Sequence, residues 1–271
     1  MGISSEAIRY YEREGIISPD KSSSSGYRSY DAWDLHVLIR TRMYRKYNFS
    51  LDETVSALNA KTFADVSDML DAKEEQLSAY IREQERILKQ LQDDRSSLHD
   101  AEMNLGKYRV EYSPAMHFLD VQRSYDIMDV HVDQYRMWID RIPFAASGGV
   151  FEFEEGNPKG KLRFGLLVND RNLDNIPEEA LKQGEPIPSR HCITTFFISG
   201  SDRDLCLDMF QPTFEFLREH NLKIAGTPFA KMVHMYHEDG TDAYRSWYQG
   251  WVPFEGEFEY CAPLPPKYER Q

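Results

Sequence analysis

The feature that most constrains the fold is the stretch 63–105, which contains neither glycine nor proline. Leucines recur in it on a heptad register, and such a pattern predicts one long helix with an apolar seam. The register is occupied by Leu70, Leu77, Leu91, Leu98 and Leu105, with Gln84 in the remaining position. At 1.5 Å per residue this helix would be roughly 60 Å long, too long to be buried within its own small domain. The seam therefore needs a partner, either a second copy of the chain in a homodimer or the C-terminal part of the same chain.

The composition excludes several classes of protein. No segment reaches the roughly 18 to 20 apolar residues of a membrane span, and the N-terminus lacks a signal peptide, so we expect a cytoplasmic protein without a membrane partner. Cys192, Cys206 and Cys261 show no CxxC spacing, which argues against a disulfide framework and against a structural zinc site. We therefore expect buried thiols and no metal or other cofactor.

The net charge of −13 is distributed unevenly along the chain. Residues 1–50 contain eight Lys and Arg against six Asp and Glu, so they carry +2 and the rest of the chain carries −15. Contact with nucleic-acid phosphates is therefore expected only at the N-terminus.

Residues 1–62 are predicted to form a helix, a hairpin and two further helices. Ser4 and Ser5 precede the first helix as capping residues, and β-prone runs at 16–17 and 27–30 flank a serine-rich loop. Asp31 or Asp34 begins the next helix, and Ser50 caps a shorter one with Glu53 in the capping-box position.

The rest of the chain changes to short β-prone runs rich in aromatic residues. The order strand, helix, strand, strand occurs twice: first at 115–121, 129–142 and the paired strands of 148–168, then at 192–199, 205–221, 223–237 and 244–254. Two copies of one unit predict a pseudo-twofold α+β domain with a groove between its halves. The fold class is thus α+β and multidomain, with a long helix between the N-terminal helices and the repeated unit.

Two segments, "IRYYEREGIISP" and "GYRSYDAWDLHVLIRTRMYRKYNFSLDE", resemble the MerR family of winged-helix transcription regulators. The resemblance implies a winged helix-turn-helix at 1–62, an antiparallel dimerisation helix at 63–105, and a homodimer bound to double-stranded promoter DNA. It also implies that the regulator distorts the promoter and so acts on RNA polymerase indirectly. The family normally has another helix before the recognition helix, and we expect it to be missing here, with weaker DNA binding as the result.

The residues expected at DNA lie in the first helix and in the wing. An arginine fork suits phosphates or guanine edges, and tyrosines offer a hydroxyl and a flat ring to the backbone. The candidates are Ser5, Arg9, Tyr10, Tyr11, Tyr27 and Arg28. Because adjacent residues of a helix point in different directions, one of Tyr10 and Tyr11 is expected to turn toward the core instead.

Besides the repeated order of strands and helices, residues 107–265 contain the strand "GTPFAKMVHMY" and a last strand ending in "WVPF". In these features they resemble GyrI-like effector-binding domains, and the resemblance implies binding of flat, lipophilic and often cationic compounds. That resemblance places a glutamate near the last strand, at the position of Gln249 in this chain, so a preference for cations is in doubt. Strand alternation puts Trp247, Gln249 and Trp251 on one face, where two indoles suit a planar ligand. Tyr125, Trp138, Phe153 and Tyr236 are further candidates for the walls, with ordinary core packing as the alternative for each.

Signals of catalysis are weak, and we expect no enzyme activity. His234 and His237 are three residues apart on a predicted strand and would face opposite sides, unlike two ligands of one metal. Two other functions remain open: a protein that sequesters or hydrolyses small molecules through its C-terminal domain, and a dimerising module that inactivates a full-length homologue.

Overall fold

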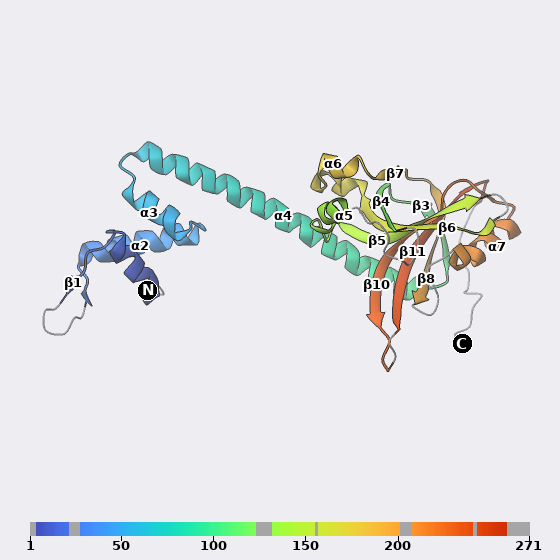
Figure 1. Ribbon diagram of the computed structural model, residues 1–271, viewed down its shortest axis with the longest axis horizontal. Helices are drawn as coiled ribbons and strands as arrows, with labels where there is room; N and C mark the ends of the chain where they lie inside the picture. The colour runs from blue at the N-terminus through green and yellow to red at the C-terminus, as the bar shows by residue number, and fades with distance from the viewer. Residues whose placement is uncertain are drawn as a thin grey trace. The chain divides into compact units, whose positions relative to one another are not determined.

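A computed structural model describes residues 4–21, 28–122, 132–154, 157–200, 207–240 and 243–258 (Figure 1). The chain divides into two compact units, Met1–Arg86 and Ile87–Gln271. Within the described ranges, no helix is long and apolar enough to span a membrane.

The first unit begins with helix α1, Ser5–Arg13, whose N-cap Ser4 accepts a hydrogen bond from the backbone of Ala7. The wing hairpin consists of β1, Asp20–Lys21, paired antiparallel with β2, Arg28–Ser29. The expected strand at 16–17 is wrong, because Ile17 is buried in the core of this unit and the strand begins three residues later. A β-branched side chain fits a buried site outside a strand equally well, so its β propensity was misleading here.

Capping boxes set the starts of the next two helices, α2 at Ala32–Lys46 and α3 at Leu51–Asn59. Asp31 and Asp34 form the first box, and Ser50 and Glu53 form the second, as the sequence predicts. Glu53 also forms an ion pair with Lys73, at 2.9 Å, which joins α3 to the beginning of the long helix.

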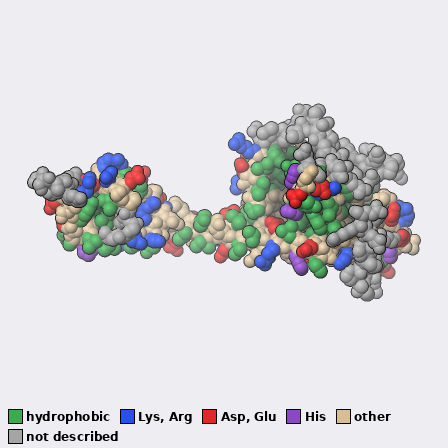
Figure 2. Space-filling model, turned by 90° about the horizontal axis from the view of Figure 1, so that it is seen from below, with side chains coloured by type: hydrophobic (Ala, Val, Ile, Leu, Met, Phe, Trp, Pro, Cys, Tyr) green, Lys and Arg blue, Asp and Glu red, His purple; other side chains and the backbone are tan. Residues whose placement is uncertain are grey.

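The long helix α4 spans Phe63–Asn104, which confirms the predicted helix to within one residue at its C-terminus. Hydrophobic side chains on its surface remain exposed in the single chain, and Figure 2 shows green side chains along the helix. The exposed set comprises Phe63, Leu70, Leu77, Tyr80, Ile81, Leu88, Leu91, Leu98 and Met103.

The second unit is built on a nine-stranded sheet with the order β3-β8-β11-β10-β5-β6-β4-β7, and β9 pairs with β11. All of its strand pairs are antiparallel. The strands are β3 Tyr108–Tyr112, β4 Met116–Gln122, β5 Ala145–Glu154, β6 Asn157–Asn169, β7 Glu185–Ile187, β8 His191–Gly200, β9 Lys223–Ile224, β10 Phe229–His237 and β11 Tyr244–Glu255. The helices are α5 Val132–Ile139, η1 Asp170–Asn175, α6 Glu178–Leu181, η2 Leu207–Phe210 and α7 Gln211–Glu219.

The predicted internal repeat is present. One half contributes β4, α5, β5 and β6, the other contributes β8, α7, β10 and β11, and the halves meet where β5 pairs with β10. The edge strands β3 and β7 were not predicted; both are short, and β7 lies in the connector between the halves.

The two faces of the sheet carry different side chains. On one face, α7 packs over a cluster that includes Phe151, Phe210 and Phe216, and α5 and α6 pack over a second cluster around Trp138. The opposite face carries a third cluster, Met116, Phe118, Val150, Leu167, Cys192, Phe229 and Trp251. The C-terminal half of α4 contributes side chains to a cavity over this third cluster.

Candidate DNA-binding face and ligand cavity

Helix α1 has a buried side and an exposed side. Tyr11 is 1% exposed and packs with Ile17 and Leu38, whereas Ser5 and Arg9 lie on the exposed side. Tyr11 therefore belongs to the core and is not available to DNA, which corrects the expectation of a contact there. Ser5 and Arg9 remain accessible.

The neighbouring Tyr10 points toward α3. Its hydroxyl donates a hydrogen bond to the carboxylate of Asp52, and this bond raises the pKa of Tyr10 to about 12. The guanidinium of Arg13 lies over the Tyr10 ring, 5.0 Å from its centroid. Tyr10 is only partly buried, so it remains partly accessible while its hydroxyl is engaged.

The wing is tied to α1 by a charged pair. Arg28 donates from Nε to Oε2 of Glu12 at 2.7 Å, and this hydrogen bond raises the pKa of the Arg28 guanidinium further above its usual range. The pair holds β2 beside the helix that carries Arg9. Tyr27, the other wing candidate, lies outside the described residues.

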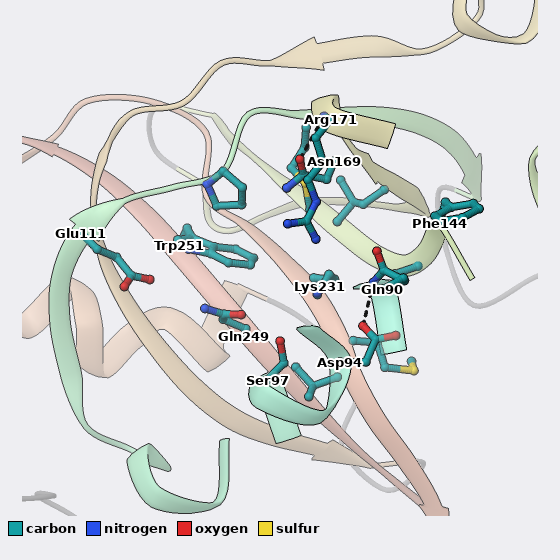
Figure 3. Close-up of a pocket in the computed structure, with 16 residues that line it drawn as sticks. Gln90, Asp94, Ser97, Glu111, Phe144, Asn169, Arg171, Lys231, Gln249 and Trp251 are labelled. Carbon is teal, nitrogen blue, oxygen red and sulfur yellow. Dashed lines mark hydrogen bonds between the residues drawn. The ribbon is translucent and has the colours of Figure 1, made fainter. Parts of the chain in front are cut away.

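The second unit contains a cavity of about 210 Å³ on the sheet face that carries the third cluster (Figure 3). Side chains of α4 face it from one side, and β10 and β11 supply much of its floor. The lining residues are Gln90, Asp94, Ser97, Glu111, Pro114, Met116, Phe144, Ala146, Leu167, Asn169, Arg171, Lys231, Met232, Val233, Gln249 and Trp251.

Two neighbouring cross-strand pairs contribute Trp251, Lys231 and Gln249 to the floor. Phe229 on β10 lies opposite Trp251 on β11, and their rings stack with centroids 4.9 Å apart. Two residues further along β10, Lys231 lies opposite Gln249. The Nε1 of Trp251 is buried and finds no acceptor among the described residues, so a ligand could accept its hydrogen bond.

Lys231 is the unusual charged group of the cavity. Burial lowers the pKa of its ammonium, with Asp94 and Asp93 acting against this effect and Arg171 adding to it. Its Nζ makes no hydrogen bond or ion pair with any residue that the structure describes. An ammonium that has lost water and makes no direct ion pair favours the approach of an anion.

The nearby carboxylates are largely engaged with other groups. Asp93 pairs with both Lys89 and Arg171. Asp94 accepts a hydrogen bond from Nε2 of Gln90 at 2.9 Å, drawn as a dashed line in Figure 3.

The predicted ligand residues separate into three groups. Gln249 and Trp251 line the cavity. Trp247 and the 41% exposed Tyr236 lie outside its lining, and Trp138 is fully buried in the cluster beneath α5 and α6. Tyr125 and the side chain of Phe153 lie outside the described residues.

Lys231 and Arg171 were missed by sequence reasoning. A signal for Lys231 was present in the sequence: it is a single charged residue within the β-prone run "GTPFAKMVHMY", and side chains on one face of such a strand are expected to be buried. Arg171 follows β6 in η1 and gives no comparable signal.

Metal chemistry has little support in the parts of the chain that the structure describes. They hold no group of three or more His, Cys, Asp or Glu side chains that could bind one ion. Cys192 is buried among apolar neighbours, and burial raises the pKa of its thiol to about 11.

Comparison with known proteins identifies the N-terminal region. The model of the MerR HTH family regulatory proteins matches residues 1–61. The HTH-type transcriptional regulator CueR of Escherichia coli O157:H7 is 35% identical over 98 residues, which cover 36% of this chain and 70% of CueR. The uncharacterized HTH-type transcriptional regulator PA4778 of Pseudomonas aeruginosa is 36% identical over 104 residues, 36% of this chain and 74% of that protein.

One solved structure is similar over most of the chain at a low level. The cryo-EM structure of the EcmrR–DNA complex in EcmrR-RPo aligns with 93% of this chain and 95% of its own, with 13% identity and a TM-score of 0.32. The family assignment therefore depends on the sequence relatives: the chain belongs to the MerR family of HTH transcription regulators.

Proposed function

We propose that the protein is a homodimer that binds double-stranded promoter DNA through its first unit and senses a small, planar, lipophilic compound in the cavity of Figure 3. Binding of that compound changes how the dimer distorts the promoter, and RNA polymerase responds to the altered DNA. The proposal rests on one observation: part of the cavity wall is formed by the long helix α4. Gln90, Asp94 and Ser97 belong to this helix, which begins in the DNA-binding unit.

The DNA-binding part of the proposal is supported by the exposed side of α1. Arg9 is exposed on this helix, and the ion pair between Arg28 and Glu12 fixes the wing beside it. A helix and a wing together reach a major groove and the adjacent backbone. The positive charge of residues 1–50 matches this location.

The dimer is supported by the exposed hydrophobic side chains of α4. Leucines at seven-residue spacing on a helix surface are typical of a coiled-coil seam, and a second copy of α4 would cover them. Two copies would also present two wings to a palindromic operator.

The switch requires a ligand that prefers one conformation of the dimer over the other. Bending a site costs on the order of 1 to 6 kcal/mol, which contacts from two helices and two wings can offset. A ligand shifts the balance only by its differential affinity for the two conformations. A ligand in a cavity lined by α4 can have this differential affinity, because its contacts with Gln90 or Asp94 act directly on the dimerisation helix.

Operator binding tests the proposal. Fluorescence anisotropy of full-length protein on a DNA fragment from upstream of its own gene should show a specific complex that weakens with salt. Arg9→Ala should weaken it by about 10- to 100-fold, the equivalent of one bidentate contact. The matched control Arg95→Ala, an exposed arginine of α4, should leave affinity unchanged. No specific, salt-dependent complex would refute the proposal and favour sequestration of a small molecule.

A further inference from the structure

We propose that the ligand of this cavity is a planar aromatic acid, with its ring against Trp251 and its anionic group against Lys231. This inference depends on the proposed function only in taking the cavity as the ligand site. It assigns the ligand a charge opposite to that of the often cationic compounds that the resemblance of the second unit implies.

The register of β10 and β11 sets the geometry. Phe229 with Trp251 and Lys231 with Gln249 are successive pairs on the same face. Residues two apart on a strand are separated by about 7 Å, and residues directly opposite each other have Cβ atoms about 5 Å apart. An aromatic ring over the indole therefore places a substituent at its edge beside the Lys231 ammonium and the Gln249 amide.

The charges around Lys231 favour an anion. Its ammonium has no ion-pair partner in the described structure, and the guanidinium of Arg171 adds positive charge nearby. Asp94 and Asp93 act on Lys231 through their charge but make no direct ion pair with it: Asp93 pairs with two cations, and Asp94 accepts a hydrogen bond from an amide. An anionic group would provide the counterion that Lys231 lacks, while a cation would be repelled by it.

The one remaining carboxylate of the lining orients the ligand. Figure 3 shows Glu111 and Lys231 on opposite sides of the Trp251 ring. An acid bound over the indole would therefore turn its anionic group toward Lys231 and away from Glu111. The Gln249 amide, opposite Lys231, can donate to the same anionic group.

Three probes with one ring and different charges test the inference by isothermal titration calorimetry on the full-length protein. They are 1-naphthoate, 1-naphthylmethylammonium and 1-naphthylmethanol. We expect 1-naphthoate to bind at least 10-fold tighter than the ammonium compound. Lys231→Met should reduce 1-naphthoate affinity at least 10-fold and leave 1-naphthylmethanol unchanged. Lys223→Met, at an exposed lysine of β9, is the matched control and should change neither.

A second variant tests the same charge logic without removing Lys231. Gln249→Glu places a carboxylate directly opposite the ammonium, so it should occupy Lys231 and lower 1-naphthoate affinity at least 10-fold. Thermal unfolding of each variant, measured without ligand, shows that it is folded.

Several results would overturn the inference: tighter binding of the ammonium compound, equal binding of all three probes, no binding of 1-naphthoate at millimolar concentration, or unchanged 1-naphthoate affinity in Lys231→Met. None of these results depends on whether the protein binds its operator. Conversely, if 1-naphthoate bound through Lys231 and no operator complex formed, the acid site would stand and the proposed regulator function would fall.

Discussion

Two adjacent tyrosines of α1 should respond to mutation in different ways. Tyr11→Ala removes a ring that is 1% exposed and packs with Ile17 and Leu38. Truncating a buried aromatic side chain to alanine costs about 3 to 5 kcal/mol. Since a typical domain is stable by only about 5 to 15 kcal/mol, the first unit should lose a large part of its stability. Even a loss of about 3 kcal/mol lowers the ratio of folded to unfolded protein more than 100-fold.

Hydrogen exchange followed by mass spectrometry on the full-length protein can measure this loss locally. Peptides from 5–17 should lose protection in Tyr11→Ala, whereas peptides from β8 and β11 of the second unit should not. Tyr10→Phe is the matched control, because it removes only the hydroxyl that donates to Asp52 and leaves the ring in place. Tyr11→Phe should likewise keep most of the protection, since it keeps the buried ring.

Operator affinity separates the two roles that Tyr11 could have. If it is a core residue, Tyr11→Ala should weaken operator binding in proportion to the loss of folded first unit, and Tyr11→Phe should bind almost normally. Full protection of 5–17 in Tyr11→Ala, together with weakened operator binding, would refute the assignment to the core and return Tyr11 to the DNA contacts.

Three further predictions concern α4, the capping box and the buried thiol. Leu91→Glu combined with Leu98→Glu should convert a dimer into a monomer in light scattering, because both side chains are exposed on the helix surface. The hydrogen bond from the Ser50 backbone, together with Lys73, lowers the pKa of Glu53. The ionised Glu53 therefore stabilises the folded protein fully above the unfolded pKa of about 4.5, and this stabilisation is lost as the pH falls through the lower pKa of the folded state. Glu53→Gln should thus cost less than about 1 kcal/mol at pH 7 and nothing near pH 2, as denaturant titrations would show. Cys192 should resist iodoacetamide at pH 8 until the protein is unfolded, since burial raises its pKa to about 11, and mass spectrometry can detect the adduct.

Local patterns in the sequence were sufficient for α2, α3 and α4 and for the order of the repeat, but not for the short helices η1 and α6. The heptad leucines and the absence of glycine and proline predicted α4, and the capping boxes at Asp31 and Ser50 predicted the starts of α2 and α3. The wing strand was misplaced because Ile16 and Ile17 have high β propensity, while tertiary packing against Tyr11 determines where Ile17 lies. The pairing of distant strands could not be predicted from local patterns either, because it too depends on tertiary contacts. The place of β3 beside β8, for example, depends on residues about 80 positions apart.

The ligand cavity shows most clearly what a pattern of alternation can and cannot predict. Alternation placed Trp247, Gln249 and Trp251 on one face and therefore predicted two indoles around the ligand. In the structure, β10 has a register shift between Met232 and His234, so Trp247 pairs with His234. The extra residue, Val233, is in β10, where it lines the cavity. Strand β11 pairs with β8 without a break, so Trp247 keeps the same face as Gln249 and Trp251 but lies farther along the strand, outside the cavity lining.

The pairing of β10 with β11 before the shift determines which side chains form the floor of the cavity. On the cavity side of the bulge, β10 stays in register with β11, which brings Lys231 opposite Gln249 and Phe229 opposite Trp251. The floor is therefore one indole and one ammonium in place of two indoles. This pairing explains why the glutamine at position 249 matters. A glutamate there would be the counterion of Lys231, whereas with glutamine the anionic group of a ligand can take that role.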